Sequence, residues 1–195
     1  MAEHLTVEKL IEFIQAQGKK GKRGMTLVAI DGPSGAGKTA LSEALQASDL
    51  AATVVHVDDF YSKEGADPSS HLTPEEGCDE YVDWMALQEL VIDPLVDGDP
   101  GFYQLYDWVA QKPDEWVTVE PRGVIVFEGV YAMRPQLRDL YDVTVYVETP
   151  KDIRLDRLSK RSDNPVWVAR WAEAEEWYNT NVIPSGYADV IVSGS

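Results

Sequence analysis

The stretch Gly32-Pro33-Ser34-Gly35-Ala36-Gly37-Lys38-Thr39 matches the phosphate-binding loop pattern G-x-x-x-x-G-K-[ST] at every fixed position. Its glycines allow backbone angles that a Cβ would disfavour, so successive N–H groups can turn toward phosphate oxygens. In this pattern the Lys38 ammonium reaches the β- and γ-phosphates, and the Thr39 hydroxyl binds Mg²⁺. We therefore expect all eight residues to bind a nucleoside triphosphate with its Mg²⁺.

The residues on either side of the loop supply the context that the pattern requires. The run 25–30 is apolar and rich in residues typical of strands, and 39–47 is a good helix sequence. A strand, a loop and a helix in this order direct the positive end of the helix dipole at the bound anion. A merely flexible Gly-rich turn, the alternative, does not require these neighbours.

Composition limits the class of protein. The chain has 195 residues, of which 44% are hydrophobic, enough for one core. We expect a single domain over 1–195, with a helix and a Gly/Lys-rich connector in 1–24. No apolar run approaches the roughly 18 residues of a membrane span. Cys78 is the one cysteine, which excludes an internal disulfide and suits a cytoplasmic protein.

The net charge of −17 bears on partners. Such a surface repels polyphosphate backbones, so we expect no nucleic acid and no membrane partner. The basic run at 19–23 is punctuated by glycines, and a solvated connector explains it better than a binding patch. A small-molecule acceptor remains the expected partner, and self-association stays open.

Strands and helices alternate along the chain, which predicts an α/β fold with a mostly parallel sheet covered on both faces. The pattern favours strands over residues 25–30, 52–57, 123–127, 142–147 and 188–192. It favours helices over 5–17, 39–47, 82–91, 149 onward with Thr149 as N-cap, and 165–180. Whether the helix over 82–91 resumes through Asp97, with a bend at Pro94, stays open. Residues 62–80 read as a loop, and 101–119 as short strands or an insertion.

Acidic residues stand at the ends of three expected strands. Asp31 ends the first, Asp58 and Asp59 the second, and Glu128 the third. Ligands bind outside the carboxyl ends of parallel strands, so neighbouring strands would bring these acids to the loop. Phosphoryl transfer needs a carboxylate near Mg²⁺ and one that takes a proton. We assign these tasks to Asp58 and Glu128, with Thr39 as the other metal ligand; capping of the next turn is the alternative, favoured for Asp31 and Asp59.

Arg154, Arg157 and Arg161 are spaced by three and four residues, and therefore share one face of a helix. Three guanidinium groups on one face suit a helical lid, over about 150–170, that closes on a transferring phosphate. A solvated face paired with Asp152 and Asp156 is the alternative. We favour Arg157 and Arg161 as catalytic residues.

Aromatic residues and histidines carry weaker signals. Three aromatic residues near helical spacing in the expected last helix are more typical of packing than of ligand contacts: Trp167, Trp171 and Tyr178. Four aromatic residues between the two strands that end in the expected catalytic acids could either form a platform for a flat acceptor or pack in the core: Trp84, Tyr103, Tyr106 and Trp108. The histidines, His4, His56 and His71, show no metal-binding spacing. We expect His56 to be a buried strand residue.

Together these features resemble the uridine kinase and phosphoribulokinase-like group of P-loop small-molecule kinases, which includes nicotinamide riboside kinases. The similar segments are 30–39, 57–61, 81–87, 106–108, 126–129, 154–161 and 187–191. The resemblance implies a three-layer P-loop NTPase fold with a helical lid. It also implies Mg²⁺-dependent transfer of the ATP γ-phosphate to a small-molecule hydroxyl, most simply a nucleoside 5′-OH.

The resemblance further implies residue roles. Asp58 would act as base, Lys38 and Glu128 would lie at the reacting phosphate, and Asp83 would hold sugar hydroxyls. Tyr61, Tyr106 and Arg134 are further candidates for the acceptor pocket.

Two departures leave the acceptor open. Gln111 stands near the position of a histidine that uridine kinases usually carry, and 162–165 shortens the Arg-rich lid. A kinase for nicotinamide riboside, pantothenate or a sugar phosphate is one alternative. A nucleotide-binding regulatory module without phosphotransfer is the other.

Overall fold

The computed structural model describes residues 2–18, 24–62, 71–107, 112–160 and 165–194. Its elements follow one another as β1 (Glu3–Leu5), α1 (Val7–Gly18), β2 (Met25–Asp31), α2 (Lys38–Ala47), β3 (Thr53–His56), η1 (Val57–Phe60), α4 (Pro74–Glu80), α5 (Trp84–Leu87), η2 (Gln88–Ile92), α6 (Asp93–Asp97), β4 (Gly101–Asp107), β5 (Lys112–Val119), β6 (Gly123–Glu128), η3 (Arg138–Leu140), β7 (Val143–Glu148), α7 (Lys151–Ser159), α8 (Pro165–Asn181), η4 (Pro184–Tyr187) and β8 (Val190–Ser193).

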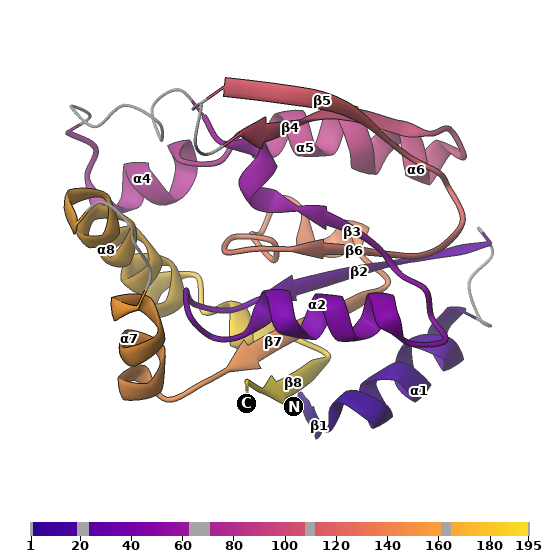
Figure 1. Cartoon of the computed structure of the whole chain (residues 1–195), viewed down its shortest axis with the longest axis horizontal. Coiled ribbons are helices and arrows are strands. Elements are labelled where there is room, and N and C mark those ends of the chain that lie inside the picture. The colour runs from indigo at the N-terminus through magenta and orange to yellow at the C-terminus, as the bar shows by residue number, and fades with distance from the viewer. Residues whose placement is uncertain (1, 19–23, 63–70, 108–111, 161–164, 195) are drawn as a thin grey trace.

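A six-stranded sheet in the order β1-β8-β7-β2-β6-β3 forms the centre, and all its pairs are parallel (Figure 1). Every residue of β2 is buried, as the continuous apolar sequence of a strand covered on both faces predicts. Strands β4 and β5 form a separate antiparallel hairpin. The predicted three-layer α/β fold is confirmed.

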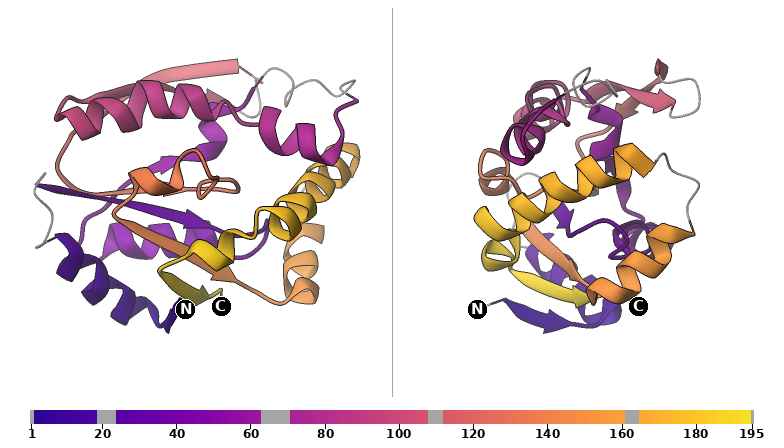
Figure 2. Two further views of the ribbon diagram at one scale, coloured as in Figure 1. Left: turned by 180° about the vertical axis from the view of Figure 1, so that it is seen from behind. Right: turned by 90° about the vertical axis from the view of Figure 1, so that its left-hand side faces the viewer.

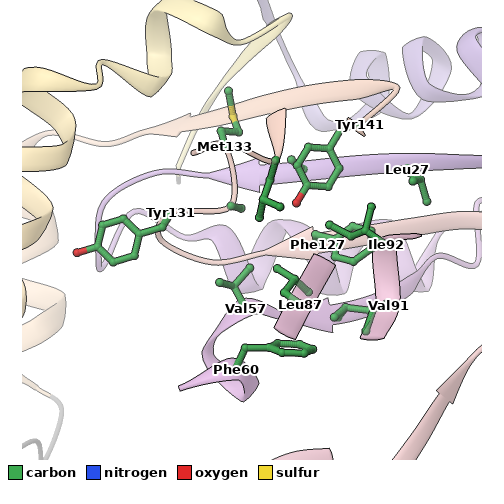
Figure 3. Packing of buried hydrophobic residues seen from close by; sticks show 14 of the residues in the cluster. Leu27, Val57, Phe60, Leu87, Val91, Ile92, Phe127, Tyr131, Met133 and Tyr141 are labelled. Carbon is green, nitrogen blue, oxygen red and sulfur yellow. The ribbon is translucent and has the colours of Figure 1, made fainter. Parts of the chain in front are cut away.

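Alternate residues of the central strands enter two different cores because successive side chains of a strand point to opposite faces. Val28 and Ile30 pack with Leu10 and Leu45, which come from the helices α1 and α2. Leu27 enters the other core, whose side chains from β6, η1, α5 and η2 are drawn in Figure 3. Because both faces of the sheet are covered, a ligand is expected to bind outside the carboxyl ends of the strands.

Helix α8 lies at that carboxyl end, between α4 and α7 (Figures 1 and 2). Residues from α7 and α8 contact the loop that follows β2, as described below. Within the described ranges, no helix is both long enough and apolar enough to cross a membrane.

Three boundary predictions were wrong. Residues 62–80 are not all loop: α4 begins after Thr73, whose hydroxyl and Glu76 form a reciprocal capping box. The first helix starts at Val7, because residues 3–5 pair with β8 as a short edge strand. The helix expected from Val82 begins only at Trp84 and is divided into α5, the π-helical turn η2 and α6, which has Pro94 in its first turn, where a proline is tolerated.

Candidate active site

The loop between β2 and α2 adopts the shape that its glycines permit. Gly35 and Gly37 have φ angles of 76° and 100°, a region that side chains disfavour. A Cβ on Gly35 would also lie 2.8 Å from the carbonyl oxygen of Arg154. Helix α2 begins at Lys38, and Gly37 has no side chain to cap it, so the first amide groups face a ligand site.

Lys38 lies inside this loop with only 9% of its surface exposed. Its Nζ donates to the carbonyl oxygen of Pro33 at 3.3 Å. Its charge lowers the pKa of the carboxyl groups of Asp31, Asp58 and Glu128. A buried ammonium among carboxylates suits the binding of a phosphate with its metal ion.

The strand order brings the predicted acids together. β6 lies between β2 and β3, and Glu128 is level with Ile30 on one side and His56 on the other. The Oγ1 of Thr39 donates to Glu128 Oε1 at 3.2 Å, so a hydroxyl and a carboxylate converge beside the loop. The neighbouring strands that the sequence required are therefore present.

This oxygen pair fits Mg²⁺. Mg²⁺ is typically held by one or two carboxylates together with substrate phosphates and water, not by an all-protein cage. Within the described ranges, no group of three or more His, Cys, Asp or Glu is arranged to hold a metal ion. Thr39 and Glu128 can thus supply the protein's share of such a site.

His56 is a functional neighbour that the sequence did not reveal. It is exposed, not buried as expected, because β3 ends there at the sheet edge. Its Nδ1 lies 2.8 Å from Glu128 Oε1, and this hydrogen bond raises the pKa of His56. Burial alone would raise the pKa of Glu128, but His56, Lys38 and Thr39 together lower it below its ordinary value. Glu128 therefore stays ionised.

Asp58 lies in the 3₁₀ turn η1, two residues beyond the end of β3. Its carboxyl is reachable by solvent but surrounded by protein. This desolvation, with the negative charges of Glu128 and Glu175, raises the pKa of Asp58 to about 6 against the opposing charge of Lys38. Such a carboxylate is ionised at neutral pH yet more basic than an ordinary aspartate.

Asp31 and Asp59 have structural partners. Asp31 is completely buried and accepts from the backbone N–H groups of Gly32 and Met133 and from the hydroxyl of Tyr178. Burial raises the pKa of Asp31 to about 6 despite these bonds. Asp59 accepts from the backbone N–H of Tyr106 and so joins η1 to β4.

The arginines of α7 face the loop. Arg154 Nη1 donates to the carbonyl oxygen of Ser34 at 3.3 Å, and Arg157 Nη1 donates to that of Gly35 at 3.1 Å. Asp156, offered as a partner in the solvated alternative, pairs with Lys160 instead. Arg161 lies outside the described residues.

The expected N-cap of α7 was wrong. The helix begins at Lys151 after Pro150, without a side-chain cap. The hydroxyl of Thr149 donates instead to the carbonyl oxygen of Ala36 at 2.8 Å, which ties α7 to the loop.

Aromatic side chains gather beside Asp58. The ring of Tyr61 lies 5.9 Å from that of Tyr106 and 5.4 Å from that of Trp171, whose Nε1 donates to the Tyr61 hydroxyl at 2.6 Å. Asp83 is held near η1 because its backbone N–H donates to the carbonyl oxygen of Phe60. Its carboxylate caps α5 by accepting from the Ala86 N–H.

Three of the other aromatic predictions have different outcomes. Tyr103 is a core residue, stacked on Phe60 at 5.0 Å. Trp84 packs against the core under the guanidinium of Arg134. Trp108 lies outside the described residues.

Arg134 is 3% exposed and pairs with Asp79 of α4 at 2.8 Å. Its guanidinium also lies 4.8 Å from the centre of the Trp84 ring. Burial lowers the pKa of Arg134, but the pair with Asp79 opposes that effect. These contacts hold α4 and the start of α5 against the segment after β6.

A family model described as an AAA domain matches residues 28–178. A uridine kinase of Staphylococcus carnosus is 31% identical over 183 residues, which cover 86% of each chain. The chain belongs to the uridine kinase-like family of P-loop small-molecule kinases.

Two further comparisons agree with this family. A uridine kinase of Streptococcus agalactiae is 32% identical to this kinase over 146 residues, 69% of this chain but 66% of the relative's length. A solved structure described as a possible uridine kinase from Bacillus stearothermophilus has a TM-score of 0.73 at 23% identity, and the match covers 95% of this chain and 96% of the other. The latter likeness concerns the fold alone.

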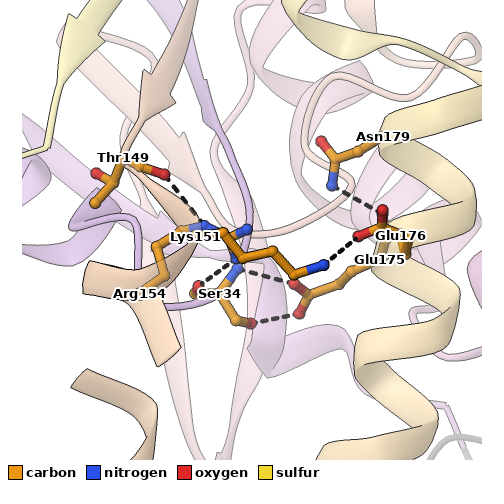
Figure 4. Close-up of polar contacts among 7 residues, drawn as sticks. All are labelled: Ser34, Thr149, Lys151, Arg154, Glu175, Glu176 and Asn179. Atoms are coloured by element: carbon orange, nitrogen blue, oxygen red, sulfur yellow. Dashed lines mark hydrogen bonds and ion pairs between the residues drawn. The ribbon is translucent and has the colours of Figure 1, made fainter. Parts of the chain in front are cut away.

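The site of this P-loop kinase contains one acidic residue that the sequence did not mark. Glu175 of α8 is 6% exposed and accepts from the backbone N–H and the hydroxyl of Ser34 (Figure 4). An acidic residue in a helix is ordinary in sequence. Its position one turn after Trp171 and three residues before Tyr178, both facing the site, is the only signal that could have indicated it.

Proposed function

We propose that this kinase transfers the γ-phosphoryl group of ATP to a hydroxyl of a nucleoside, with Mg²⁺ as cofactor. The observation that carries the proposal is the convergence of Lys38, Asp58 and Glu128 at the carboxyl ends of three neighbouring strands. A regulatory module that only binds nucleotide has no use for a carboxylate with a raised pKa beside its phosphate loop.

The loop and its neighbours bind the donor. The eight residues 32–39 surround the phosphates, and Lys38 pairs with their negative charge. Thr39 and Glu128, with Asp58 nearby, would hold Mg²⁺, which when bound neutralises charge on the β- and γ-phosphates. Positioning and electrostatics supply most of the catalysis in such reactions.

Asp58 acts as the base. As the acceptor oxygen forms its bond to phosphorus, the bond between phosphorus and the ADP oxygen breaks, and the hydroxyl proton passes to the Asp58 carboxylate. With a pKa near 6, Asp58 is mostly ionised at pH 7 and still basic enough to take that proton. Arg157, which binds the loop, and Arg161 stabilise charge on the transferring group.

The acceptor binds on the aromatic side of Asp58. Tyr61 and Tyr106 place packed aromatic rings in this region, a lining that suits a flat base better than a simple sugar. Asp83 lies close enough to η1 to accept from sugar hydroxyls, and Arg134 holds the walls of this region in place. The names of the relatives, uridine kinases, support the same class of acceptor.

The test is ADP release with ATP and Mg²⁺ over a panel of uridine, cytidine, nicotinamide riboside, pantothenate and simple sugars. We expect turnover that depends on a nucleoside and is largely lost in Asp58→Asn. Asp139→Asn, at an exposed position, is the matched control and keeps full activity. Turnover with only a non-nucleoside, or none with any acceptor, would contradict the proposal.

A further inference from the structure

The carboxylate of Glu175 binds the same loop that is expected to bind phosphate. Its Oε2 accepts from the backbone N–H of Ser34 at 2.9 Å, and its Oε1 accepts from the Ser34 hydroxyl. Figure 4 shows this carboxylate reaching from α8 to the loop, while Arg154 contacts the carbonyl oxygen of Ser34. Both oxygens of a buried anion are thus held by one residue of the phosphate loop.

Ser34 belongs to the part of the loop nearest the Lys38 ammonium, whose Nζ is 3.3 Å from the carbonyl oxygen of the preceding Pro33. In loops of this kind the lysine reaches the β- and γ-phosphates. The carboxylate of Glu175 therefore lies at the end of the loop where the terminal phosphates of the donor would be.

Glu175 is not neutralised by a salt bridge in the described part of the chain. The adjacent Glu176 is exposed and pairs with Lys151, so the two acids have different surroundings. The charge of Glu175 also acts on Asp58, whose pKa it helps to raise. A triphosphate arriving at Ser34 would meet the carboxylate of Glu175 in addition to those of Asp58 and Glu128.

We propose that Glu175 competes with the donor for the phosphate loop and thereby sets the affinity of this kinase for ATP. The carboxylate satisfies Ser34 when no nucleotide is bound, and it leaves Ser34 when the triphosphate binds. Part of the binding free energy of ATP is consumed in this displacement. The inference rests on the proposed function only in taking a nucleoside triphosphate as the donor.

The rest of α8 stays in place during this exchange. Tyr178, three residues later, donates to the buried Asp31, and Trp171, four residues earlier, binds Tyr61. With the helix fixed on both sides, Glu175 leaves by rotation of its side chain. Replacing Glu175 therefore changes nucleotide affinity without removing the helix from the site.

The test is calorimetric titration of ATP with Mg²⁺ and no acceptor into the wild type and Glu175→Gln. The glutamine keeps the shape and one acceptor oxygen but lacks the charge. We expect the Kd for ATP to fall about tenfold, because a like charge beside the phosphates is removed. The control Glu176→Gln removes the same charge from the same helix turn and leaves the Kd within about twofold, since exposed charges are screened.

A second variant shows whether the side-chain amide of the introduced glutamine itself alters nucleotide binding. Glu175→Ala removes both the charge and the contact, with a residue that favours helices, and we expect ATP to bind more tightly here too. An unchanged or increased Kd in both folded variants would overturn the inference, because Glu175 would then support nucleotide binding or be neutral. Tighter binding of ATP without phosphorylation of any acceptor would uphold this inference and contradict the proposed function.

Discussion

The proposed donor side and the proposed acceptor side of this site are built in different ways. The donor side is one contiguous loop, 32–39, plus the ends of three adjacent strands, held by backbone geometry. The acceptor side is assembled from η1, the start of α5, the hairpin and α8, held by side chains that meet across more than 100 residues of sequence, as Tyr61 meets Trp171.

The difference shows where chemistry and selectivity reside. A contiguous loop that binds phosphate through its backbone tolerates few changes, and its eight residues are enough to predict what it binds. A wall of packed aromatic rings can change its acceptor by altering one side chain at a time. Changes on the donor side should therefore reduce rate by orders of magnitude, and changes on the acceptor side should mainly alter KM.

The largest effect is expected from Lys38→Ala on the donor side. Loss of the buried ammonium removes a positive charge that acts on Asp31, Asp58 and Glu128, together with the proposed phosphate contact. We expect kcat/KM for ATP to fall about 10³-fold. Lys160→Ala, at an exposed lysine paired with Asp156, is the control and should keep its activity. A loss of less than tenfold in Lys38→Ala would contradict the assigned role.

Asp58→Asn comes next, because Asp58 joins the two sides. We expect kcat to fall about 10²-fold, the lower range for a general base. In the wild type, kcat/KM should rise with pH through about 6 as Asp58, whose pKa is raised, becomes ionised. The variant should lose that rise. An unchanged acidic limb would assign the titration to another group, with Asp31 the first candidate because its pKa is also raised to about 6.

Tyr178→Phe tests the contact by which α8 is fixed to the sheet. The change removes one of three donors to the buried Asp31 carboxylate. We expect the free energy of unfolding to fall by about 2 kcal/mol, the contribution of one hydrogen bond to a charged group. Urea unfolding measures it, with Tyr187→Phe at an exposed tyrosine as control. Equal stability of the two variants would contradict the role of this contact.

The smallest effect is expected from Tyr61→Phe on the acceptor side. The ring stays between Tyr106 and Trp171, but the hydroxyl that accepts from Trp171 Nε1 is lost. We expect the KM for the nucleoside to rise about threefold, the effect of one hydrogen bond, while the KM for ATP stays constant. A change in the ATP KM alone would show that this aromatic group does not face the acceptor.

The fold was largely predictable from sequence. Continuous apolar strands alternating with helices indicated a parallel sheet, and the strand-end acids proved to lie on neighbouring strands. The misses were local. The capping box of Thr73 and Glu76 is present in the sequence, but the polar segment that follows it lacks the apolar periodicity that predicts a helix. The edge strand at residues 3–5 is too short to give a pattern and depends on its pairing with β8.

The site was predictable only on the donor side. The spacing in the α7 sequence indicated which arginines share a face, and Arg154 and Arg157 do contact the loop. His56 and Glu175 could not be found in this way. Each acts through a partner that is distant in sequence, Glu128 or Ser34, so only the folded chain brings the pair together.

The most direct test of the central claim follows the phosphoryl group itself. Purified protein is incubated with ATP labelled at the γ-phosphorus, Mg²⁺ and uridine, and the products are separated after a single turnover. We predict that the label appears in uridine monophosphate with the wild type and stays almost entirely in ATP with Asp58→Asn. Label found only in inorganic phosphate, or retained in ATP with uridine and every other nucleoside, would contradict the claim that this site is a nucleoside kinase.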